Sequence, residues 1–77
     1  MGYAIYEDTV GIDPIVIHKD TCTYYTNRKP SVKTSKWHTL ATLDEADKFG
    51  EKIANKQGCK RCDDCLDGAR IVDPESL

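Results

Sequence analysis

The chain has little of what a large hydrophobic core requires. Its 77 residues include one Phe, one Trp and one Met, and a chain of this length buries only about 60% of the surface that its unfolded form exposes. Small domains of this kind are usually stabilised further by disulfides, a structural metal or a partner. The sequence also lacks a catalytic acid–base pair, a nucleophile–histidine arrangement and a phosphate-binding loop. It therefore indicates a protein that is not an enzyme.

Long apolar runs are absent as well. No stretch approaches the ~20 consecutive apolar residues that cross a bilayer, and the N-terminal sequence MGYAIYEDTV lacks the basic start and apolar run of a secretory signal. Tyr6 stands where a myristoylation pattern needs Ser or Thr. We therefore expect a cytoplasmic (intracellular) protein with no membrane partner. In that reducing compartment, closely spaced cysteines favour metal binding over disulfides.

Acidic residues are missing from the middle of the chain. Residues 21–43 carry four bases and no acid, whereas residues 1–20 carry four acids and one lysine, and residues 44–77 carry nine acids and six bases. The net charge of −2 therefore conceals a basic segment between two acidic ones.

The basic segment also contains aromatic rings, a combination that suits phosphates and stacked bases. The candidate nucleic-acid-binding residues are Arg28, Lys29, Lys33, Lys36 and Trp37. The alternative is that the aromatic rings pack into the small core and leave the lysines on a solvated loop. The acidic flanks also weaken a broad nucleic-acid footprint. DNA is thus one expected partner and a protein is the other.

The pattern of secondary structure indicates a small α+β domain. Alternating or β-branched residues predict strands near 2–7 and 14–19, a third strand around 37–42 and a brief strand at 70–72. The polar, Pro-containing stretch 25–36 predicts a loop. We expect a single domain spanning 1–77, with two or three short antiparallel strands, one helix and a tail, 70–77, that frays.

The helix is the clearest element and is expected at about 43–57. The sequence TLDE forms a capping box, in which the Thr42 hydroxyl accepts from a free amide and Glu45 reaches back. Apolar residues then recur at intervals of three and four. Gly58 is the expected C-terminal stop.

Four cysteines and a histidine are spaced as metal ligands. Zinc takes four thiolate or imidazole ligands in a tetrahedron. The sequence HKDTC offers His18 and Cys22, and CKRC offers Cys59 and Cys62 from a tight turn. We predict one zinc ion per chain bound by these four residues, with Cys65 as the alternative fourth ligand.

Three other interpretations remain open. Zinc can be bound by the four cysteines alone, with His18 as a bystander. The same four cysteines can hold a [4Fe–4S] cluster, although the usual closing Cys-Pro is absent. Cys59 and Cys62 can form a redox pair, although no thioredoxin-like βαβ pattern surrounds them. His38, next to Trp37, is expected to be a surface or packing residue.

The motifs HKDTC, Trp37, DEA at 44–46 and GCKRC at 58–62 resemble the zinc-binding domain of the Ada methylphosphotriester-repair family. The resemblance covers roughly residues 15–65 and implies zinc and a DNA-facing surface. Two features depart from that family: a longer middle segment, and His18 in place of the methyl-accepting cysteine. Because an imidazole cannot perform that sulfur chemistry, the resemblance implies a plain zinc module without methyl transfer.

Overall fold

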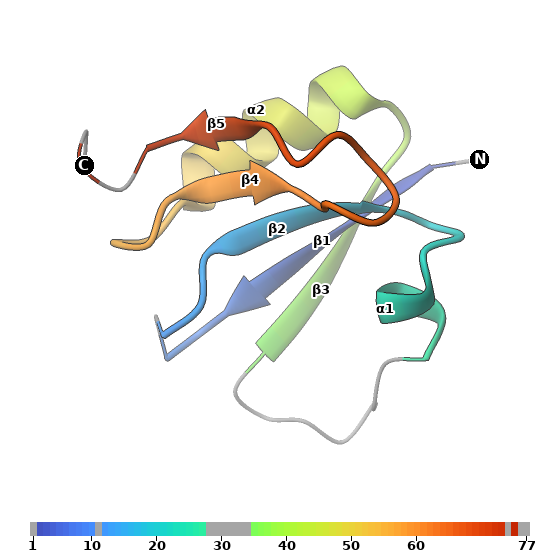
Figure 1. Cartoon of the computed structure of the whole chain (residues 1–77), viewed down its shortest axis with the longest axis horizontal. Helices are drawn as coiled ribbons and strands as arrows, with labels where there is room; N and C mark the ends of the chain where they lie inside the picture. The colour runs from blue at the N-terminus through green and yellow to red at the C-terminus, as the bar shows by residue number, and fades with distance from the viewer. Residues whose placement is uncertain (1, 11, 28–34, 74, 76–77) are drawn as a thin grey trace.

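The computed structural model describes residues 2–10, 12–27, 35–73 and 75 (Figure 1). The elements in chain order are β1 (Tyr3–Asp8), β2 (Ile15–Lys19), α1 (Thr23–Thr26), β3 (Ser35–Leu40), α2 (Leu43–Ile53), β4 (Cys59–Arg61) and β5 (Arg70–Val72). The expected α+β class is confirmed. Among the described residues, no helix has the length and apolar character needed to cross a membrane.

The described strands form one sheet in the order β3-β1-β2-β4-β5. The β1 strand pairs antiparallel with both β2 and β3, as expected for the first three strands. The expectation of two or three antiparallel strands misses β4, which lies parallel to β2 and antiparallel to β5. The brief strand expected at 70–72 is confirmed as β5. The parallel pairing of β2 and β4 brings the two cysteine-containing segments together.

The α2 helix begins where the sequence predicts and ends earlier. The Thr42 hydroxyl accepts from the Glu45 amide at 3.2 Å, so Thr42 is the N-cap. The helix stops at Ile53 rather than near residue 57, because Asn55 forms a turn of its own. Its side chain accepts from the Gln57 amide at 2.8 Å. Asparagine side chains that hydrogen-bond to nearby backbone amides compete with the hydrogen bonds of a helix.

The loop expected at 25–36 is corrected in part. Its first residues belong to α1, a single helical turn that follows Cys22. The rest of that stretch up to residue 34 includes Arg28, Lys29 and Lys33, which lie outside the described residues.

The α2 helix covers one face of the sheet, and the core lies between them. Ile5 pairs with Ile17 on β2, and both are fully buried together with Ile15, Ala46 and Cys59. Because successive side chains of a strand point to opposite faces, the neighbouring residues Tyr6, Val16 and His18 point away from α2. That second face, called the open face below, carries the candidate site.

Candidate metal centre

Four potential ligands converge on the open face. His18, Cys22, Cys62 and Cys65 each offer one ligand atom, and these four atoms lie within 4.8 Å of one another. The Cys22 sulfur lies 3.6 Å from His18 Nδ1 and 4.0 Å from the Cys62 sulfur. His18, Cys22 and Cys62 are buried and Cys65 is half-buried. The described part of the molecule therefore contains a compact cluster of one imidazole and three thiols.

The first pair of ligands is positioned by the end of β2. His18 is the penultimate residue of that strand and points to the open face. The chain then turns through a hydrogen bond from the Cys22 amide to the Lys19 carbonyl at 3.0 Å. Cys22 is the N-cap of α1, so the helical turn begins at the cluster. The His-x3-Cys spacing brings the side chains of His18 and Cys22 together, as the sequence predicts.

The second pair is positioned by the parallel pairing of β4 with β2. Cys62 follows directly after β4, and its amide donates to the Ile17 carbonyl at 2.8 Å. This bond places Cys62 beside the strand that carries His18. The chain then turns, with the Leu66 amide bonded to the Cys62 carbonyl at 3.0 Å, and Cys65 lies within the turn.

Backbone amides point at two of the sulfurs. The Asp64 amide donates to the Cys62 sulfur at 3.4 Å, and the Lys19 amide donates to the Cys65 sulfur at 3.2 Å. Hydrogen bonds of this kind stabilise negative charge on sulfur and orient the ligand around a metal. The Asp64 amide belongs to the same turn as the two sulfurs, whereas the Lys19 amide at the end of β2 connects the two halves of the cluster.

The two distances from the Cys22 sulfur to its neighbouring ligand atoms fit zinc. Tetrahedral zinc with bonds of about 2.3 Å to sulfur and about 2.0 Å to nitrogen sets S···N separations of about 3.5 Å and S···S separations of about 3.8 Å. The observed 3.6 Å between Cys22 and His18 and 4.0 Å between Cys22 and Cys62 are within a few tenths of an ångström of these values. All four cysteines are free thiols. The residues present therefore suit a metal ion.

Burial disfavours the charged forms of His18 and Cys65. Desolvation lowers the pKa of His18, with the Asp64 charge acting weakly in the other direction. The pKa of the Cys65 thiol is raised to about 12, first by desolvation and then by the neighbouring Cys22 and Cys62, while the hydrogen bond from the Lys19 amide acts in the other direction. Zinc binds neutral imidazole and thiolate, so binding to these sulfurs would release protons.

Cys59 does not join the cluster, and the predicted ligand set is corrected at this position. Its side chain is fully buried in the core under α2, on the face of the sheet opposite the cluster. In the parallel pairing it lies opposite Ile15, another core residue. Burial, followed by the charges of Asp47 and Glu51, raises the pKa of Cys59 to about 12. Cys65, named as the alternative ligand, occupies the fourth place beside His18.

The position of Cys59 in the core also argues against the three other interpretations of the cysteines. The all-cysteine zinc site and the [4Fe–4S] cluster both require Cys59 as a ligand, and the redox pair requires it beside Cys62. A signal for the observed arrangement was present in the sequence, since Cys62-x2-Cys65 has the same spacing as Cys59-x2-Cys62. Three equally spaced cysteines cannot by themselves indicate which overlapping pair binds.

The candidate nucleic-acid residues are only partly described. Lys36 and Trp37 are adjacent in β3, so their side chains point to opposite faces of the sheet. Trp37 belongs to the open face, where its ring lies 5.4 Å from the His18 ring. The two residues therefore cannot contact the same nucleotide from one face.

His38 packs as the sequence predicts. Its Nε2 lies 2.7 Å from the Glu7 carboxylate, and its ring lies 4.8 Å from the Phe49 ring of α2. It takes no part in the metal cluster of the described residues.

Comparisons with protein-family models, with curated proteins and with solved structures find no match to this chain. The resemblance to Ada-like domains therefore stays a prediction. It was carried in part by Cys59, which lies in the core, whereas His18, Cys22 and Cys62 belong to the cluster.

Proposed function

We propose that the chain is a zinc-stabilised, non-catalytic module that binds a protein partner. The observation that carries the proposal is the convergence of His18, Cys22, Cys62 and Cys65 within 4.8 Å of one another. Zinc is the metal that suits a tetrahedral set of one imidazole and three thiolates.

A structural role for the zinc follows from the number of protein ligands. Catalytic zinc sites keep one position for water or substrate, whereas structural sites are closed by four protein ligands. The four groups of this cluster would supply all four ligands of a tetrahedral zinc ion. The ion would connect the end of β2 and the start of α1 to the turn after β4, which are about 40 residues apart in the sequence. That connection compensates for the small core.

A protein partner is favoured over DNA by the charges next to the cluster. Three aspartates, Asp13, Asp63 and Asp64, line the cavity on the open face together with one lysine. Carboxylates repel the phosphate backbone that dominates affinity for nucleic acid. Trp37, the aromatic residue expected to stack on bases, lines this same acidic cavity.

Elemental analysis tests the proposal directly. We expect one zinc per chain in the purified protein and loss of the native NMR dispersion when a strong chelator removes it, because the binding free energy of structural zinc is folding free energy. Readdition of zinc should restore the spectrum. Iron with inorganic sulfide in place of zinc, or a native spectrum after complete removal of the metal, would contradict it.

A further inference from the structure

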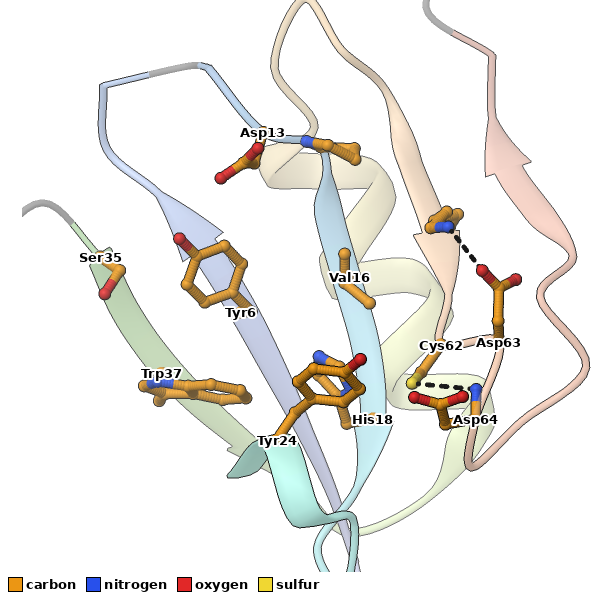
Figure 2. A pocket seen from close by; sticks show the side chains of 12 residues that line it. Tyr6, Asp13, Val16, His18, Tyr24, Ser35, Trp37, Cys62, Asp63 and Asp64 are labelled. Atoms are coloured by element: carbon orange, nitrogen blue, oxygen red, sulfur yellow. Dashed lines mark hydrogen bonds and ion pairs between the residues drawn. The ribbon is translucent and has the colours of Figure 1, made fainter. Parts of the chain in front are cut away.

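The open face carries a cavity of about 640 Å³. It is bordered by β1, β2 and β3 on one side and by the turn after β4 on the other (Figure 2). Tyr6, Tyr24 and Trp37 supply aromatic surface, and Val16 lies between them and the acidic side. The α2 helix covers the opposite face of the sheet, so nothing from that helix fills this cavity.

The rings of the cavity form one connected cluster. The Trp37 ring lies 5.4 Å from the Tyr6 ring at 60° and 5.4 Å from the His18 ring at 44°. The His18 ring lies 5.6 Å from the Tyr24 ring. His18 belongs to the metal cluster, so a bound metal would hold the ring that stands between Trp37 and Tyr24. Tyr24 is 58% exposed, which leaves much of its ring open to a ligand.

The charged groups that line the cavity are three carboxylates and one ammonium group. Lys60 lies 3.1 Å from the Asp63 carboxylate and is therefore paired within the cavity. No ion pair within the described part of the chain involves Asp13 or Asp64. Figure 2 shows Asp64 across the cavity from Trp37, and Asp13 at the end formed by the β1–β2 turn. The Tyr24 hydroxyl hydrogen-bonds to the Asp64 carboxylate. The cavity therefore combines ring faces with two carboxylates, Asp13 and Asp64, that form no ion pair with any described residue.

The turn that carries Asp13 adds exposed apolar surface. Val10 and Ile12 are 56% and 70% exposed, and they are two of the three large hydrophobic residues exposed among the described ones. The turn is held by Asp8, whose carboxylate accepts from the Val10, Ile12 and Asp13 amides. Exposed apolar side chains on the segment that leads to Asp13 offer further contact area to a partner.

From these features we infer that the cavity binds a lysine or arginine side chain from a basic segment of a partner protein. A cation is attracted to the face of an aromatic ring, most strongly to Trp, and is attracted further by nearby carboxylates. Val10 and Ile12 would contact the residues that flank the inserted side chain. The inference rests on the proposed binding function and adds the chemistry of the partner.

Trp37 makes the inference measurable, because it is the single tryptophan of the chain. The probe is a blocked peptide of alternating lysine and glycine, added to the zinc-loaded protein while tryptophan emission is recorded. We expect saturable changes in emission that weaken as salt is added. A peptide with glutamate in place of lysine should leave the emission unchanged.

Matched charge variants distinguish binding in the cavity from a general effect of the net charge of the protein. Asp64→Asn and, on a different element, Asp13→Asn should each weaken binding of the lysine peptide about threefold, as expected for one exposed ion pair. Glu51→Gln removes one negative charge from an exposed position on α2 and should leave the affinity unchanged. Equal weakening by Glu51→Gln and both aspartate variants would show a general charge effect and overturn the inference.

Two further outcomes are decisive. If millimolar lysine peptide does not change the Trp37 emission of the zinc-loaded protein, the inference is overturned. If single-stranded oligonucleotides change the emission and the lysine peptide does not, nucleic-acid binding replaces the inference. A protein that contains no zinc and still binds the lysine peptide supports the cavity and refutes the structural zinc. Metal content is therefore measured on every sample.

Discussion

The missing side chain of Gly50 makes room for the sulfur of Cys59. A Cβ atom placed on Gly50 would lie 2.7 Å from the Cys59 sulfur, and also 3.2 Å from Ile71 and 3.4 Å from Ile17. The α2 helix therefore approaches β4 and β5 more closely than any other residue at this position allows. This contact places Cys59 in the core, so that the metal cluster contains Cys62 and Cys65 but not Cys59.

Gly50→Ala should destabilise the domain although alanine is the better helix former. The gain of about 1 kcal/mol in helix propensity is outweighed by overpacking against the Cys59 sulfur, which typically costs about 1–3 kcal/mol. The free energy of unfolding, measured with guanidinium on the zinc-loaded protein, checks this result.

The Cys59→Ala background supplies the control. Removing the sulfur should relieve the clash, so that Gly50→Ala becomes neutral or stabilising there, with a coupling energy of about 1–3 kcal/mol between the two positions. Additive effects of the two substitutions would contradict the contact.

Alkaline pH should destabilise the protein through Cys59. Burial raises the pKa of this thiol from an ordinary value near 9 to about 12, so the folded state keeps the proton that the unfolded chain loses. The stabilisation is complete below about pH 9 and is lost as the pH rises towards about 12.

The measurement compares wild type with Cys59→Ala under reducing conditions. The free energy of unfolding of the wild type should fall more between about pH 8 and about pH 10 than that of the variant. Parallel curves would show that Cys59 is not held as a buried neutral thiol. Both proteins keep the same four ligands, so their titration cancels in the comparison.

The assigned ligands predict opposite outcomes for two cysteine variants. Cys65→Ala should lower zinc affinity by at least about 100-fold, since even partners of ligands contribute about 10- to 100-fold. Cys59→Ala should retain one zinc per chain. Competition with a chromophoric chelator gives both affinities. Loss of zinc in Cys59→Ala with retention in Cys65→Ala would reject the assignment.

Asp8→Ala should destabilise the β1–β2 turn. Asp8 is 7% exposed, and its carboxylate accepts from the Val10, Ile12 and Asp13 amides at 2.9–3.0 Å. Leaving such groups without their partner costs about 1–3 kcal/mol in the free energy of unfolding. Amide hydrogen exchange should accelerate at residues 10, 12 and 13 well beyond any change in α2. Uniform acceleration across the molecule would show that Asp8 acts on global stability alone.

Short-range chemistry accounts for the parts of the fold that the sequence predicts well. The N-cap at Thr42 needs only residues within one helical turn, and it forms as expected. Strands β1 and β2 follow from alternating and β-branched residues. The pairing of His18 with Cys22 is also local, since four residues of chain bring the two side chains together.

The end of α2 and the existence of β4 depend on longer-range contacts. The Asn55 side chain donates to the Asp13 carbonyl at 2.9 Å, a bond between residues 42 positions apart that helps to anchor the turn after the helix. A strand of three residues such as β4 is too short to show a pattern, and it forms because β2 offers free backbone groups along its edge.

By itself, the sequence determined an α+β domain, a capped helix and a cluster of histidine and cysteine suited to a metal. Only the tertiary structure decided which sulfurs meet. In the parallel register of β4 against β2, Cys59 lies opposite Ile15 and is buried under α2, whereas Cys62 follows the strand beside the Ile17 carbonyl. Equal spacing of Cys59, Cys62 and Cys65 carries no information about this register. The pairing of the strands decides the outcome, because it places Cys59 on the core face of the sheet under α2 and brings Cys62 to the metal cluster.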